Sequence, residues 1–251
     1  MTHTLSHRQI LDIATCMGYY ILQNGGEISR AEDTVERIGL AYGMDAVHAF
    51  AISSTIVVSA EKGGESLSQS RRIKKPVTNL HKVELYNALS RKICETHPSY
   101  DEIVESLRAI HKEPGYPLPI AVFSQALIGG AFAVFFGGGL VEFIIAFLIG
   151  AVLKLVLHLA DFLQSPPFFA NVVGSAVTVF LSFLSTFVFP GINTETVNIG
   201  VLMNLVPGVL LTNCIRDFIA MDYVAGLAKI TEALLVAGAI AMGVALSILW
   251  R

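Results

Sequence analysis

The pattern of hydrophobic and polar positions changes near residue 116. Before it, apolar residues alternate with many charged ones; beyond it, they form charge-free runs at 114–141, 162–194, 196–215 and 233–250. A helix that crosses the hydrocarbon core of a bilayer needs about 20 mostly apolar residues. We therefore expect an α-helical membrane protein with about five transmembrane helices, preceded by a small soluble α+β domain. The expected boundaries are 1–116 for the soluble domain and 117–251 for the transmembrane domain.

Glycine and proline divide the apolar runs into individual spans. Turns are expected at the three consecutive glycines 137–139, at Pro166-Pro167 and at Pro190-Gly191. The second span contains Lys154, but near one end, where its long side chain reaches the headgroups. The expected spans are about 118–137, 141–160, 170–190, 197–216 and 223–249.

The soluble part shows both helical and strand periodicity. Helices are expected at 5–23, 29–42, 79–96 and 99–112, and strands at 46–52, 55–60 and 67–73, which gives the order ααβββαα. The second and fourth helices each begin with a serine followed three residues later by glutamate, the pattern of a capping box: Ser29 with Glu32, and Ser99 with Glu102. Residues 62–65, Lys-Gly-Gly-Glu, predict a tight hairpin turn.

Charge and motif content exclude several function classes. The net charge is −3, and only ten of the 37 charged side chains lie beyond residue 116. A nucleic-acid-binding protein would need a strong basic excess. No phosphate-binding glycine loop, nucleophile motif or metal-ligand spacing is present, so we expect no enzyme activity, no cofactor and no metal site. Cys16, Cys94 and Cys214 form no disulfide framework and are expected to be reduced.

The few basic residues of the second part predict its orientation. Lysine and arginine favour cytoplasmic loops. With the N-terminal domain inside, Lys154, Arg216 and Lys229 fall at inner ends of spans, and the outer loops 137–140 and 190–196 carry no Lys or Arg. We therefore expect a multi-pass protein of the cell (inner) membrane with a cytoplasmic N-terminal domain.

Polar residues concentrate in 193–232, where a span is interrupted by Pro207-Gly208. Proline breaks or kinks a helix, and broken helices in transporters bind substrates and ions. A carboxylate-bearing substrate would suit the guanidinium of Arg216. Alternatively, Arg216, Asp217 and Asp222 simply mark a cytoplasmic loop. The candidate substrate-binding residues are Asn204, Pro207, Gly208, Thr212, Asn213 and Arg216, and the candidates for proton or ion coupling are Asp217 and Glu232.

The last expected span has a face of small side chains that would let another helix approach closely. This face serves either packing within the chain or an interface with another subunit, including a second copy in a homo-oligomer. Its residues are Ala233, Ala237, Ala241 and Ala245, with a second row of Ala239, Gly243 and Ser247 beside them.

Two groups of residues resemble the threonine/serine exporter family, in its N-terminal, larger half. The first is Gly25-Gly26-Glu27 with the following helix. The second is Val206-Pro207-Gly208, Leu211-Thr212-Asn213, Arg216-Asp217, Asp222-Tyr223, Ala225-Gly226-Leu227 and Glu232-Ala233. The resemblance implies a five-span module behind a cytoplasmic domain. It also implies a split-subunit branch, which includes the large subunit of a succinate exporter and works with a separate small membrane subunit.

These observations predict a membrane subunit of a secondary exporter of small carboxylate-bearing metabolites. The substrate would be threonine, serine or a dicarboxylate such as succinate, and export would be proton-coupled, since no nucleotide-binding motif is present. The partners would be the lipid bilayer and the small membrane subunit, with no nucleic acid. The alternative is a non-transporting regulatory or scaffold subunit whose soluble domain binds a ligand or partner.

Overall fold

The computed structural model describes residues 5–74 and 76–249, which divide into two compact units. The first unit contains the chain up to residue 114 together with 213–229, and the second contains 115–212 and 230–251. The sequence predicted one boundary near residue 116, whereas the structure adds the short segment 213–229 to the first unit.

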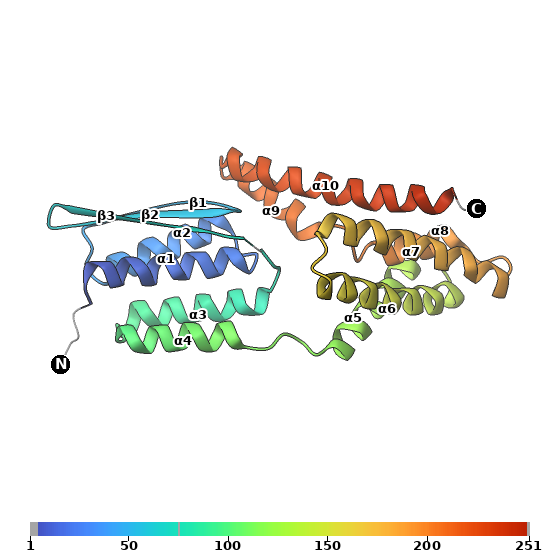
Figure 1. Ribbon diagram of the computed structural model, residues 1–251, viewed down its shortest axis with the longest axis horizontal. Coiled ribbons are helices and arrows are strands. Elements are labelled where there is room, and N and C mark those ends of the chain that lie inside the picture. The colour runs from blue at the N-terminus through green and yellow to red at the C-terminus, as the bar shows by residue number, and fades with distance from the viewer. Residues whose placement is uncertain (1–4, 75, 250–251) are drawn as a thin grey trace. The chain divides into compact units, whose positions relative to one another are not determined.

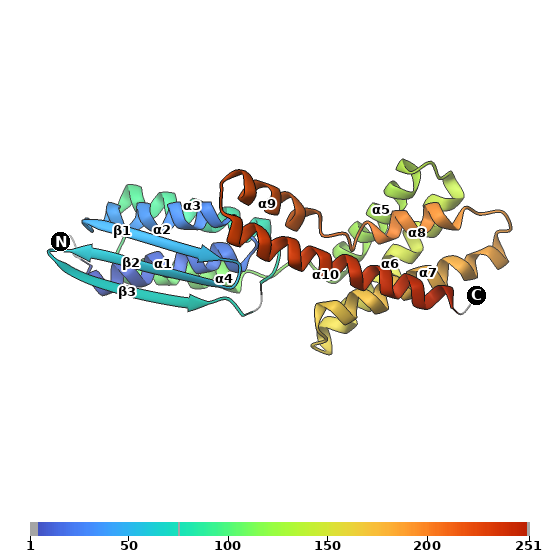
Figure 2. The same cartoon turned by 90° about the horizontal axis from the view of Figure 1, so that it is seen from above.

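The first unit has the predicted order ααβββαα. Its elements are α1 (His7–Gln23), α2 (Ile28–Ala41), β1 (Ala46–Ile52), β2 (Thr55–Lys62), β3 (Glu65–Arg72), α3 (Leu80–Thr96) and α4 (Tyr100–Lys112). The strands form one antiparallel sheet in the order β1-β2-β3 (Figure 2). The predicted hairpin turn is confirmed, because Lys62 pairs with Glu65 across Gly63 and Gly64, which have φ of 58° and 83°.

One of the two predicted capping boxes is wrong. Ser99 and Glu102 form the expected reciprocal bonds at the start of α4. The second helix instead begins at Ile28, with Glu27 at the N-cap position and no side-chain capping bond. Glu32 accepts a hydrogen bond from the backbone N–H of Ala51 on β1 at 2.8 Å. The Glu32 carboxylate therefore bonds to a residue distant in the sequence, and not to the N-cap of its own helix.

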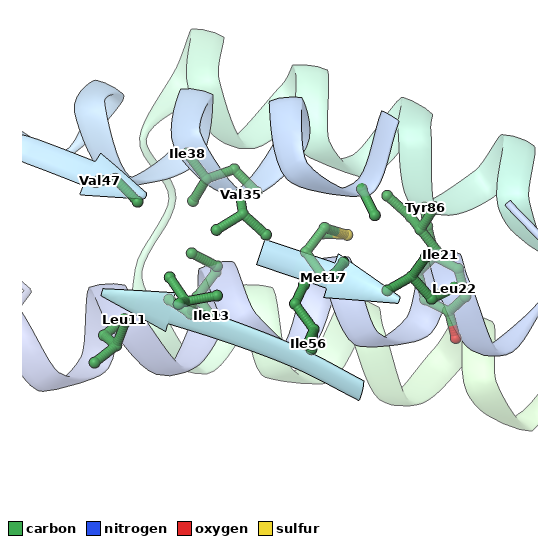
Figure 3. Close-up of a cluster of buried hydrophobic side chains, with 14 of the residues drawn as sticks. Leu11, Ile13, Met17, Ile21, Leu22, Val35, Ile38, Val47, Ile56 and Tyr86 are labelled. Atoms are coloured by element: carbon green, nitrogen blue, oxygen red, sulfur yellow. The ribbon is translucent and has the colours of Figure 1, made fainter. Parts of the chain in front are cut away.

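Three layers make up the first unit: the sheet, the α1–α2 pair and the α3–α4 pair (Figure 1). Apolar side chains from α1, α2 and the inner face of the sheet pack together in one cluster (Figure 3). Met17, Val35 and Ile56 belong to it and are fully buried. Burial of such a side chain stabilises the fold by about 1.5–3 kcal/mol. Ala225, from the segment 213–229, belongs to the same cluster and is also fully buried.

The second unit is helical. Its helices are α5 (Leu118–Phe135), α6 (Leu140–Phe162), α7 (Pro167–Val188), α8 (Thr194–Leu202) and the larger part of α10 (Tyr223–Ile248), with α9 (Gly208–Ile219) beginning in this unit. Among the described residues, α5, α6, α7 and α10 are long and apolar enough to cross a membrane. The expected span 197–216 is not one continuous helix, because α8 and α9 are separated by residues 203–207.

Glycines let the helices of the second unit approach each other closely. A Cβ at Gly200 of α8 would lie 2.6 Å from the backbone nitrogen of Ala133 on α5, and one at Gly150 of α6 would lie 2.9 Å from the Gln125 carbonyl oxygen. Such contacts are too short for any side chain, so α5 packs backbone to backbone on both neighbours.

The two rows of small residues on α10 have different environments. In the second row, Ala239 and Gly243 are buried and the Ser247 hydroxyl donates to the Ala176 carbonyl of α7 at 3.0 Å. In the first row, Ala233 is buried, whereas the remaining three alanines are exposed: Ala237, Ala241 and Ala245. Close packing against α7 is therefore made by the second row.

Candidate functional site

The structure breaks the polar segment 193–232 where proline and glycine predicted it. The helix α8 ends at Leu202, and α9 begins at Gly208 directly after Pro207. Proline lacks an N–H to continue the first helix, and its fixed φ suits the start of the second. The Pro207 carbonyl accepts the first helical bond, from Leu211 N–H at 3.0 Å. The break is therefore a defined interruption with a helix on each side.

Asn204 anchors the break to α5. Its amide nitrogen Nδ2 donates to the Val201 carbonyl at 3.1 Å and, more weakly, to the Gln125 carbonyl of α5 at 3.4 Å. The side chain is half-buried. Among the other substrate candidates, Thr212 is exposed and donates to the Gly208 carbonyl at 2.9 Å. The structure therefore groups Asn204, Pro207, Gly208 and Thr212 around one interruption of the second unit.

The end of α9 carries two ion pairs, both within the first unit. Arg216 pairs with Glu27, the residue that precedes α2. Asp217 pairs with Lys229 of α10, with Oδ2 and Nζ 2.6 Å apart, and the two residues are only 7% and 6% exposed. A buried charge needs an opposite charge to offset its lost hydration. Each of these two candidates therefore already has a protein partner in this structure.

The α9–α10 turn is closely packed around these ion pairs. The Cys214 thiol donates to the Gly226 carbonyl at 3.3 Å, and a Cβ at Gly226 would lie 2.7 Å from the ring of Phe218. Asp222 accepts from the Ala225 N–H at 3.2 Å, as a cap for α10. Asn213 is half-buried in the same unit, and Glu232 is exposed in the second unit.

Lys229 and Glu27 were missed as site residues by the sequence reasoning. Lys229 lies one short helical hairpin beyond Asp217, and a lone lysine beside an apolar span is a reason to look for an acidic partner. Glu27 belongs to the Gly25-Gly26-Glu27 motif, but the sequence does not indicate its partner, because Arg216 lies 189 positions further along the chain. The glycines before it indicated only a turn, which Gly25, with φ of 84°, forms.

A separate polar cluster surrounds Asp12 on α1. Its carboxylate accepts from Arg71 Nη2 at 2.8 Å, Gln69 Nε2 at 3.1 Å and the Tyr100 hydroxyl at 3.1 Å. Burial alone would raise the pKa of Asp12, but the hydrogen bonds from Gln69 and Tyr100 and the charge of Arg71 lower it below its ordinary value. A cavity of about 630 Å³ opens beside this cluster. The cluster ties β3 and α4 to α1.

Comparison with known proteins adds to this geometry. A family model described as a putative threonine/serine exporter matches residues 12–249. The chain belongs to the threonine/serine exporter family. This is a family of transporters rather than enzymes.

Relatives in the family carry two kinds of name. The chain is 26% identical to the threonine/serine exporter of Corynebacterium glutamicum over 249 residues, which is 95% of this chain and 50% of the relative. It is 25% identical to the probable succinate transporter subunit YjjP of Klebsiella aerogenes over 229 residues, or 91% of this chain and 88% of that one. A probable threonine/serine exporter of Mycobacterium tuberculosis is 20% identical over 97% of this chain and 46% of its own length.

The chain thus spans about half the length of the two relatives named as threonine/serine exporters, and most of the length of the one named as a transporter subunit. No solved structure matches it.

Proposed function

We propose that this chain is the membrane subunit of a secondary exporter of small carboxylate-bearing metabolites, threonine and serine or a dicarboxylate such as succinate. The observation that carries the proposal is the α8–α9 break at Pro207-Gly208, held by Asn204, in a member of this transporter family. Interrupted helices expose backbone dipoles and carbonyls to a substrate at the depth of the membrane. Arg216 would hold the substrate carboxylate after releasing Glu27, and Asp217 and Glu232 would carry the coupling protons.

We further propose that the chain acts with a separate small membrane subunit. The relative that this chain covers almost completely is named a transporter subunit, whereas the relatives named as exporters are about twice as long. The exposed alanines of α10 offer a face of small side chains for it.

We also propose five crossings of the membrane, and the connectivity of the first unit supports this number if that unit lies on one side. The chain leaves the first unit after residue 114 and returns to it at 213. Between these points it must cross an even number of times, and α5, α6 and α7 provide three crossings. The fourth would run through α8, the break and the start of α9, before the chain returns to the first unit at residue 213.

The basic residues favour a first unit that lies on the cytoplasmic side of the inner membrane. Single cysteines in a cysteine-free background test this topology. A membrane-impermeant maleimide should label Glu195→Cys in intact cells and Asp161→Cys only after permeabilisation. Labelling of both positions from the same side would contradict the five-crossing arrangement.

Efflux from preloaded cells tests the function. Cells would be loaded separately with labelled threonine, serine and succinate, expressing this chain alone or with the small subunit. We expect efflux only when both are expressed, and Asn204→Ala should reduce it, whereas Asn87→Ala, at a half-buried position on α3, should not. Efflux by this chain alone would refute the need for a partner. No efflux of any substrate, with both proteins in the membrane, would favour a regulatory or scaffold subunit instead.

A further inference from the structure

The helix α7 carries a line of polar side chains that none of the roles above uses. Ser175, Thr178 and Ser182 recur on one face of the helix, and each is fully buried although α7 is an apolar candidate span. Polar groups inside membrane segments are costly, and they are retained where they face a pathway or a bound ion.

The hydroxyl groups on this line have used their only donors. Thr178 Oγ1 donates to the Gly174 carbonyl at 2.9 Å, and Ser182 Oγ donates to the Thr194 carbonyl of α8 at 3.4 Å. A hydroxyl has one hydrogen to donate and two lone pairs to accept with. These two oxygens therefore present acceptor capacity to their surroundings.

Asn198 of α8 adds an acceptor without a partner. Its amide oxygen Oδ1 is completely enclosed and receives no hydrogen bond among the described residues. A buried acceptor left unsatisfied costs about 1–3 kcal/mol. The side chain lies on a helix that ends at the Pro207-Gly208 break.

The contacts between α7 and α8 place Asn198 at the level of Thr178. The two helices are joined by residues 189–193 and run antiparallel, as Figure 2 shows. At one end Ser182 meets Thr194, and further along a Cβ at Gly174 would lie 3.9 Å from Leu205. Thr178 lies one helical turn from Ser182 on α7, and Asn198 lies one turn from Thr194 on α8. Both steps lead towards the Gly174–Leu205 contact, so the two residues share one level.

We propose that Asn198, Thr178 and Ser182 form a binding site for a small monovalent cationic group, either Na⁺ or the primary ammonium of an amino-acid substrate. Amide, hydroxyl and carbonyl oxygens are hard acceptors, the ligand type that hard cations take in proteins. A monovalent cation can be coordinated by several such oxygens at once, whereas an uncharged donor with one hydrogen satisfies only one of them. The transport role of the site rests on the proposed function, but its cation binding does not.

Cation binding is measured on the full chain alone, purified into nanodiscs. The thermal unfolding midpoint is compared in NaCl and in choline chloride at equal ionic strength, without substrate, for the Na⁺ arm. For the ammonium arm, L-serine is compared with 3-hydroxypropionate, which lacks the amine. We expect one of the two cations to raise the midpoint of the wild type.

Variants assign the effect to the site. Asn198→Leu and Thr178→Val should abolish the rise, whereas Asn198→Asp, which offers a charged acceptor, should lower the half-saturating cation concentration several-fold. Thr186→Val is the matched control on the same helix, because the Thr186 hydroxyl donates to Phe183, within its own turn, and the residue is not part of the site. This control should keep the full wild-type response.

Two results would overturn the site: no rise with either cation, or a rise that survives in Asn198→Leu. Efflux measured in parallel separates this inference from the proposed function. Efflux without a cation-dependent shift would remove the site and leave the transport function standing. A cation-dependent shift without efflux of any substrate would leave the site standing and remove the proposed transport function.

Discussion

The ion pair between Asp217 and Lys229 gives a sharp test of how the α9–α10 turn is held. At an effective dielectric constant near 20, unit charges 2.6 Å apart attract each other by about 6 kcal/mol. Most of this attraction offsets the hydration that both charges lose, since the residues are 7% and 6% exposed. Removal of one partner leaves the other buried and unpaired, which costs about 3–5 kcal/mol. For a chain of this size, that lowers the thermal midpoint by roughly 6–20 °C.

The assay is thermal unfolding in detergent of Asp217→Asn, Lys229→Met and the double variant. Each single variant should lose stability, and the double variant should recover most of it, because a neutral replacement of a buried pair is often tolerated. Arg216→Gln is the matched control on the same helix. Its pair with Glu27 is half-exposed, so the loss should stay below about 1 kcal/mol. Small losses in both single variants, or a double variant as unstable as the sum, would refute the reasoning.

Three further outcomes are expected elsewhere in the chain. Gly243→Ala should destabilise α7–α10 packing by about 1–3 kcal/mol, since the new Cβ would collide with the Ser175 hydroxyl. Gly238→Ala, where a Cβ meets open space, should be neutral or slightly stabilising in the same thermal unfolding measurement. Equal effects of the two variants would contradict this packing. Burial raises the pKa of Glu32 above its ordinary value, so the stability that this group contributes is present below that value and is lost as pH rises through the raised pKa. The unfolding free energy of Glu32→Gln should therefore increase relative to that of the wild type between acid and neutral pH. A difference that does not change with pH would contradict the raised pKa. Burial likewise raises the pKa of the Cys16 thiol to about 11, so mass spectrometry at pH 8 should find its alkylation roughly a hundredfold slower than that of a free cysteine, and a rate like that of the free thiol would contradict its burial.

Features that depend only on residues close together in the sequence were predictable. Ser99 with Glu102 capped a helix, the glycines at 63 and 64 formed a hairpin, and Pro207-Gly208 interrupted a span. In each case the residues that cause the feature lie within a few positions of it, so neighbouring sequence determines the outcome. The four uninterrupted spans were predictable for a related reason, since their apolar length alone requires a non-aqueous environment.

Features that depend on distant partners were not predictable. Glu32 has the right spacing for a capping box, yet it bonds to Ala51 on a strand. The sequence named Arg216 and Asp217 as candidates but did not identify their ion-pair partners, Glu27 and Lys229. No periodicity in one segment records which other segment it will meet. The line from Ser175 to Ser182 was missed because isolated hydroxyl residues are common in apolar helices.

The helix α9 connects the two kinds of candidate residue through its own rigidity. It begins at the Pro207-Gly208 break and carries Arg216 and Asp217 within its last turn. Because the break and both ion-pair residues belong to one helix of 12 residues, α9 itself offers a connection between them. Neutralising Asp217 together with Lys229 keeps the turn folded but removes the titratable group. In our proposal this double variant would therefore still export substrate, but with an efflux rate that no longer depends on the proton gradient. An unchanged dependence would assign coupling to Glu232 instead.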